Sequence, residues 1–170
     1  MTHYTHCTTD DEFADISLFL LDHRLDLHAS LSTVDIISLL YSFITEGHLI
    51  RVTDDEHRTI AALTYYHGTP ENEFADRHTA MIGLTVADRT YRGSRLFFNG
   101  LRFIVDHIAE QHPEVQEVQF AAVKENTYLC RLYSKFMTFS HLRDGRNGQE
   151  MVFCEKINNL KATLAKLAKV

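Results

Sequence analysis

A short basic segment between an apolar run and an amphipathic stretch holds the residues with the clearest chemical potential. Residues 86–97 read VADRTYRGSRLF, which predicts the end of a strand, a polar turn with Arg92 and Arg95, and a helix from about Ser94. Backbone N–H groups at a helix N-terminus attract phosphates, and guanidinium groups add charge-assisted hydrogen bonds. The segment therefore indicates an anion site. The alternative is a capped helix with two solvated arginines.

A second segment further along the chain also joins a strand to a helix. Residues 115–123 predict a buried strand, and residues 126–136 predict a helix behind it. Asn126 stands where an N-cap residue would stabilise that helix. Tyr133 shares an apolar helical stripe with Phe136, so packing in the core is one interpretation of this tyrosine.

Together the two segments resemble the motifs of the GNAT superfamily of N-acetyltransferases. The first family motif is matched by Val86, Tyr91, Arg92, Gly93 and Leu96, and the second by Asn126, Leu132, Tyr133 and Lys135. The predicted order of elements follows the family over residues 2–156. Two departures stand out in the first motif, because Arg95 and Phe97 occupy positions where the family has glycine-like residues.

The resemblance implies acetyl-CoA, or another acyl-CoA, as co-substrate and no metal. In the family the pantetheine arm pairs with the strand before the basic loop, and the pyrophosphate meets the loop. The cofactor-binding positions that match are Leu84, Thr85, Val86, Arg92, Gly93, Ser94, Arg95, Leu96 and Asn126. Tyr133 aligns with a tyrosine that protonates the leaving thiolate. A general base would come from Glu73, Asp76 or His78, among which the sequence does not choose.

The expected activity is transfer of an acetyl group from acetyl-CoA to a primary amine, on a small molecule or a protein, by direct attack on the thioester. Two alternatives stay open. Phe97 and Phe98, in place of glycine-like character, favour a longer acyl chain or a donor carried on acyl carrier protein. A degenerate loop also fits a non-catalytic GNAT-fold sensor or interaction domain.

The elements that must position these residues predict an α+β fold, an α/β/α sandwich. Its sheet is expected to be mixed and mostly antiparallel, with a central parallel strand pair and helices on both faces. Strands are expected at residues 2–7, 48–52, 59–67, 74–86, 115–123, 137–142 and 150–154. Helices are expected after the capping boxes at Thr9 and Ser32, from about Ser94, from Asn126 to Phe136 and over the tail.

A single domain is expected over residues 1–156, with the amphipathic helix 157–170 as part of it. This tail could dock on the domain, pair with a second copy in a homodimer, or stay solvated. Gly83, inside the long predicted strand, indicates a bulge or a point of close backbone approach.

Composition excludes several classes of protein. The chain of 170 residues is 45% hydrophobic with a net charge of −6, and it lacks the basic face of a nucleic-acid binder. No apolar run approaches the ~20 residues that span a bilayer, and the polar N-terminus is unlike a secretory signal. A cytoplasmic location is the expectation. Three cysteines predict no disulfide framework, and the tightest His/Cys group, His3, His6 and Cys7, lacks metal-site spacing.

Overall fold

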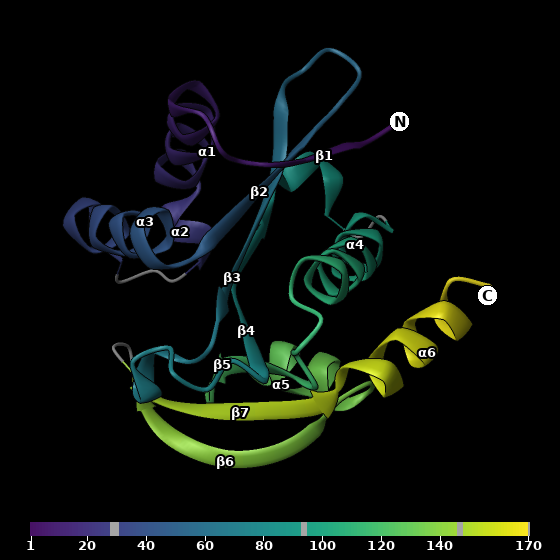
Figure 1. Ribbon diagram of the computed structural model, residues 1–170. Helices are drawn as coiled ribbons and strands as arrows, with labels where there is room; N and C mark the ends of the chain where they lie inside the picture. The colour runs from purple at the N-terminus through teal and green to yellow at the C-terminus, as the bar shows by residue number, and fades with distance from the viewer. Residues whose placement is uncertain (28–30, 93–94, 146–147, 170) are drawn as a thin grey trace. The chain divides into compact units, whose positions relative to one another are not determined.

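Seven strands and six α-helices form in the part of the chain that the computed structural model describes, residues 1–27, 31–92, 95–145 and 148–169 (Figure 1). The strands are β1 (His3–His6), β2 (His48–Thr53), β3 (Thr59–His67), β4 (Thr79–Ala87), β5 (Glu117–Val123), β6 (Thr138–Gly145) and β7 (Gly148–Lys156). The helices are α1 (Asp10–Asp22), α2 (Arg24–Leu27), α3 (Thr33–Glu46), α4 (Leu96–Gln111), α5 (Thr127–Ser134) and α6 (Ile157–Leu167).

The strands form a mixed sheet in the order β1-β2-β3-β4-β5-β7-β6. β4 and β5 run parallel, with registers from Thr79 opposite Glu117 to Ile82 opposite Phe120. The pairs β1–β2, β2–β3, β5–β7 and β6–β7 are antiparallel. The mostly antiparallel sheet with one parallel pair, predicted from the order of elements, is confirmed.

The chain divides into two compact units. The first contains residues 1–66 and 83–100, and the second contains residues 67–82 and 101–170. β4 and α4 therefore each contribute residues to both units. The predicted site residues divide between the units: residues 84–96 belong to the first, and Glu73, His78, Asn126 and Tyr133 belong to the second.

The helices of the first unit begin where the sequence signals predict. Thr9 caps α1 and Ser32 caps α3, each in a capping box that is completed by Glu12 or Asp35 three residues later. Both helices pack against β2 and against each other. Their buried faces carry Ile16, Phe19, Leu20, Ile36, Leu40 and Phe43. The short helix α2 carries no such signal and was not predicted.

In the second unit, β7 pairs with β5 on one side and with β6 on the other, as Figure 1 shows. The tail helix α6 follows β7 directly and buries Ile157, Leu160 and Leu164. These three buried residues agree with a tail that docks on the domain, and pairing with a second copy in a homodimer stays a prediction. None of the helices in the described ranges, α6 included, is long and apolar enough to cross a membrane.

The predicted strand over residues 74–86 is wrong in its first five residues, because β4 begins at Thr79. A 3-10 turn occupies Pro70–Asn72, and Glu73 and Phe74 then adopt left-handed backbone angles, with φ of 51° and 60°. The Asp76 carboxylate accepts hydrogen bonds from the Thr69 N–H at 2.7 Å and its hydroxyl at 2.8 Å. These side-chain bonds hold the segment in a turn, which apolar alternation alone does not reveal.

Candidate functional site

The loop that follows β4 is fixed at its first residue, in the first unit. The Asp88 N–H donates to the Ile60 carbonyl at 2.8 Å, and its carboxylate accepts from the Thr90 N–H at 2.9 Å. A hydrogen bond from the Thr90 hydroxyl, chief among several, lowers the pKa of Asp88. The loop therefore begins from a charged, anchored residue. Gly93 and Ser94, which were predicted to bind the cofactor, lie outside the described residues.

Asp26 of α2 holds two arginines of this loop. Arg89 donates to its Oδ1 at 2.9 and 3.2 Å, and Arg92 lies 2.9 Å from its Oδ2. The Asp26 side chain is only 11% exposed. The hydrogen bond from Arg89, opposed by desolvation and aided by the bond from Arg92, lowers the pKa of Asp26. Arg92, predicted as an anion ligand, is thus already ion-paired, and an incoming phosphate would share it with Asp26.

A second link joins the loop to the end of α1. His23 Nε2 lies 3.3 Å from Asp88 Oδ2, and the His23 ring stacks on Phe19 with centroids 4.1 Å apart. His23 and Asp26 were not predicted as site residues. They lie in a short stretch of mixed polar and apolar residues, 22–27, and their partners lie more than sixty residues away in the chain, so no local pattern marks them.

Asp26→Asn is expected to destabilise the protein by about 1 kcal/mol at pH 7, a modest value because solvent screens both partly exposed guanidinium groups. A lowered pKa means that the carboxylate stabilises the folded state above the ordinary carboxyl pKa of about 3.9, and that this stabilisation is lost as the pH falls below it. Urea unfolding of both proteins at pH 7 and pH 3 should show a difference that shrinks in acid. An Asp144→Asn control, at an exposed position of β6, should show little difference at either pH.

The β4 segment predicted to pair with pantetheine begins beside a buried threonine. The Leu84 N–H donates to the Thr64 hydroxyl at 2.6 Å, so a side chain of β3 satisfies this backbone group. At Gly83 a Cβ atom would lie 2.6 Å from Cζ of Phe43 and 2.9 Å from the Thr64 hydroxyl. The group that approaches Gly83 closely is thus the Phe43 ring of α3, a side chain, where the sequence indicated a bulge or a close backbone approach. Val86 is buried, and Leu84 and Thr85 are half-buried.

At the start of α4, Arg95 and Phe97 stand at the two positions where the GNAT motif that the sequence resembles has glycine-like residues. Arg95 is exposed immediately before the helix, and Leu96 is buried. The rings of Phe97 and Phe98 meet edge to face at 5.5 Å and are both half-buried. Arg95 is therefore the predicted loop residue that offers an exposed guanidinium next to a helix N-terminus, an arrangement suited to phosphate.

Asn126 and Tyr133 lie at opposite ends of α5, in the second unit. The Asn126 side chain accepts a hydrogen bond from the Leu129 N–H at 3.2 Å, so it is the N-cap of the helix, as one of its two predicted roles requires. Seven residues at about 1.5 Å of rise place Tyr133 about 10 Å further along the axis. Tyr133 is 3% exposed, and its ring contacts those of Phe120, Phe136 and Phe153. Its packing role is confirmed, and a catalytic role for its hydroxyl stays a prediction.

The three candidate bases occupy the turn between β3 and β4, in the second unit. Glu73 and His78 are exposed, so water and a substrate could reach either side chain. Although desolvation opposes it, hydrogen bonding from the Thr69 N–H and hydroxyl lowers the pKa of Asp76. A carboxylate with a lowered pKa is a weaker base, and Asp76 already serves to hold the turn. Glu73 and His78 therefore remain the better candidates.

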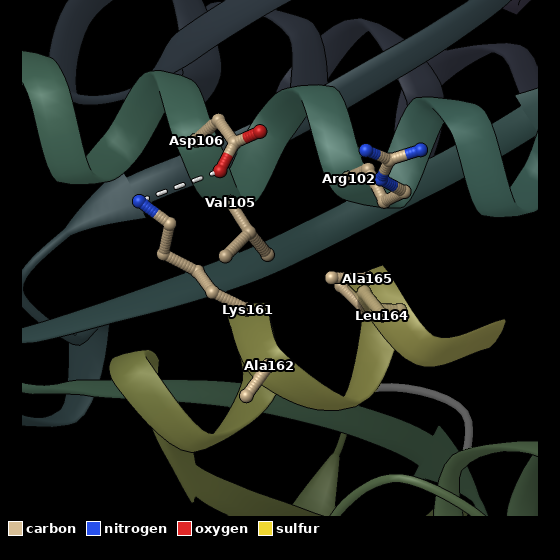
Figure 2. A pocket seen from close by; sticks show the side chains of 7 residues that line it. All are labelled: Arg102, Val105, Asp106, Lys161, Ala162, Leu164 and Ala165. Atoms are coloured by element: carbon tan, nitrogen blue, oxygen red, sulfur yellow. Dashed lines mark ion pairs between the residues drawn. The ribbon is translucent and has the colours of Figure 1, made fainter. Parts of the chain in front are cut away.

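A cavity of about 330 Å³ lies between α4 and α6 in the second unit, as Figure 2 shows. Lys161 of α6 reaches toward Asp106 of α4, with Nζ 3.5 Å from Oδ1. The remaining lining comes from Arg102, Val105, Ala162, Leu164 and Ala165. None of the residues predicted for acyl transfer lines this cavity.

The three cysteines are free thiols with raised pKa values. Desolvation raises the pKa of Cys7 to about 11, and it also raises that of Cys130. Desolvation and a bond to Glu117, 2.8 Å from the sulfur, raise the pKa of Cys154 to about 12. A thiol needs a low pKa to act as a nucleophile, so none of these cysteines is a candidate for covalent catalysis.

Comparison with known proteins gives a likeness in structure but not in sequence. No family model matches the chain, and no curated protein matches it. The aminoglycoside acetyltransferase AAC(6')-Ib, solved with coenzyme A and kanamycin, is 17% identical with a TM-score of 0.71 over 96% of this chain and 99% of that chain. Ribosomal-protein-S5-alanine acetyltransferase from Vibrio fischeri is 14% identical with a TM-score of 0.64, over 94% and 96% of the two chains.

A further solved structure carries the family name that the sequence motifs suggested. It comes from Desulfovibrio desulfuricans, is assigned to the GNAT family, and is 9% identical with a TM-score of 0.69, over 92% of this chain and 99% of that chain. These likenesses run over almost the full length of the chain. The protein has the GNAT fold.

Proposed function

We propose that the protein is an N-acetyltransferase that moves an acetyl group from acetyl-CoA to a primary amine. The main support for the proposal is a basic connection between β4 and α4, ending at the exposed Arg95, in a chain that has the GNAT fold. The similar AAC(6')-Ib structure holds coenzyme A, which agrees with a CoA-type donor.

The proposed reaction is a direct transfer without an acyl-enzyme. The neutral amine nitrogen attacks the thioester carbonyl, a C–N bond forms, and the C–S bond breaks to release the thiolate. An alkylammonium has a pKa near 10.4, so a base must first remove a proton. Glu73 or His78 is proposed for that step. Tyr133 is proposed to donate its phenolic proton to the thiolate, because a phenol near pKa 10 and a thiol near 8.5 are close enough for transfer.

The donor is proposed to be held by two groups of residues. Leu84, Thr85 and Val86 supply backbone groups for the pantetheine arm, and Arg92 and Arg95 supply positive charge for the pyrophosphate. Gly93, Ser94 and Leu96 are proposed to bind the same pyrophosphate, and Asn126 is proposed to contact the arm near its reacting end. Because Arg92 is ion-paired with Asp26, we assign the larger share of the phosphate affinity to Arg95.

Calorimetric titration with acetyl-CoA tests this assignment. Arg95→Gln is expected to weaken binding about tenfold or more, since a hydrogen bond to a charged group contributes about 1.5–3 kcal/mol. Arg58→Gln, at another exposed arginine of the same unit, is the matched control and should bind as the unaltered protein does. Absence of binding at millimolar acetyl-CoA would rule out the proposed donor.

Turnover assays on the same protein distinguish the other two candidate functions. Turnover with thioesters of acyl carrier protein, but not with acetyl-CoA, would favour the carrier-bound donor that Phe97 and Phe98 suggest. No turnover with either donor, across a panel of small amines and peptide N-termini, would favour a sensor or interaction domain.

A further inference from the structure

Two histidines and a glutamate converge in the second unit, among residues that have no part in the proposed acyl transfer. His67 ends β3, His112 follows the last turn of α4, and Glu114 lies in the loop before β5. One ligand atom of each residue lies within 4.8 Å of the other two. No sequence pattern predicts this group, because 45 positions separate His67 from His112 and only His112 and Glu114 lie near each other in the chain.

The contacts within the group centre on one imidazole nitrogen. His67 Nε2 lies 3.1 Å from Glu114 Oε1 and 2.9 Å from the carbonyl oxygen of Arg77. The rings of His67 and His112 are 4.1 Å apart between centroids. His67 is buried, whereas the Glu114 side chain is 52% exposed. Since both oxygens near Nε2 are acceptors, we assign a hydrogen to that nitrogen when no cation is bound.

This donor set has the chemistry of a zinc site. Imidazole nitrogens and a carboxylate oxygen bind Zn²⁺ at about 2.0–2.2 Å, and two histidines with one glutamate leave a fourth position for water. Ligand atoms on a tetrahedral ion at such bond lengths lie about 3.4 Å apart, so a group whose ligand atoms lie within 4.8 Å of one another must contract by up to about 1.4 Å. The half-exposed Glu114 can supply that movement by a change of rotamer.

We propose that His67, His112 and Glu114 bind a divalent cation of the Zn²⁺ class. The cation displaces the proton on His67 Nε2 and takes one nitrogen from each histidine and one oxygen from Glu114. The Arg77 carbonyl, 2.9 Å from Nε2, is a further oxygen within reach. The Arg77 guanidinium, which donates to the His67 carbonyl at 3.0 Å, brings one opposing positive charge. Binding joins the end of β3 to the end of α4 and to the loop before β5.

Titration of the metal-free protein with Zn²⁺ and with Co²⁺, followed by calorimetry and by the visible absorption of Co²⁺, tests the proposal. The unaltered protein should bind one equivalent. His112→Ala and Glu114→Gln should each weaken binding at least about tenfold, the low end of the loss seen when even an outer partner of a metal ligand is removed. These two positions are preferred to the buried His67, where a substitution could disturb folding.

His6→Ala is the matched control, because it alters another pair of imidazoles that meet closely: His6 Nε2 lies 3.2 Å from His48 Nδ1. It should bind Zn²⁺ as the unaltered protein does. Loss of binding in His6→Ala, equal binding in Glu114→Gln, or no binding at millimolar Zn²⁺ would each overturn the proposal. A rise in melting temperature with Zn²⁺ in the unaltered protein, absent in Glu114→Gln, gives a second readout that needs no acyl-transfer activity.

Discussion

Tyr133→Phe is expected to lower the rate of acyl transfer about 10²- to 10⁴-fold, the range over which a positioned acid or base contributes to catalysis. The substitution removes one hydroxyl and keeps the ring that packs against Phe120, Phe136 and Phe153. The fold should therefore persist while the proton for the leaving thiolate is lost. Steady-state kinetics with acetyl-CoA, together with a melting curve, give the measurement.

The same helix offers a matched control. Tyr128 is one of the exposed large side chains of the chain, and Tyr128→Phe should change neither rate nor stability. An unchanged rate in Tyr133→Phe would mean that Tyr133 has only a packing role and that the proposed proton donation is wrong. Tyr133→Ala is not a substitute for this test, because it empties a buried aromatic position and should cost about 3–5 kcal/mol of stability by itself.

Leu160→Ala is expected to destabilise the protein by about 2–5 kcal/mol, the second large effect. Leu160 lies on the buried face of α6 with 0% exposure, whereas Leu167, the last residue of α6, is 45% exposed. Loss of the Leu160 side chain removes apolar contacts and leaves a cavity. Loss of the Leu167 side chain should cost little.

Urea unfolding of both α6 variants measures this difference directly. An effect of Leu160→Ala as small as that of Leu167→Ala would mean that α6 adds nothing to the stability of its unit. Concentration-dependent melting in the unaltered protein would instead bring back the alternative in which the tail pairs with a second copy.

Local signals in the sequence were sufficient for most of the elements. Thr9, Ser32 and Asn126 each cap the helix that their position predicted, because a cap depends on residues only three positions apart. The strand predicted from residue 74 begins only at Thr79. The pattern of apolar residues does not show side-chain hydrogen bonds such as those between Asp76 and Thr69, which hold the preceding turn. The short helix α2 was missed, because its four residues are too few to show the helical period of apolar residues.

The candidate site was less accessible to sequence reasoning, and the reason is distance along the chain. Arg92 was expected to be a solvated arginine or an anion ligand, and the structure pairs it with Asp26, which no local pattern connects to it. Gly83 was expected to mark a bulge or a close backbone approach, and the group next to it is the ring of Phe43, forty residues earlier in the chain. Such partners become visible only when the fold brings distant segments together.

The state of the three thiols has a practical consequence for measuring the proposed reaction. Each turnover would release coenzyme A with a free sulfhydryl, which aromatic disulfide reagents convert to a coloured product. Such reagents react with accessible thiolates. Cys7 and Cys154, with pKa values of about 11 and 12, hold almost none at neutral pH, and Cys130 is buried with a raised pKa. The protein's own colour yield should thus be slow and small. A continuous optical assay can therefore run on the unaltered chain, without a cysteine-free variant.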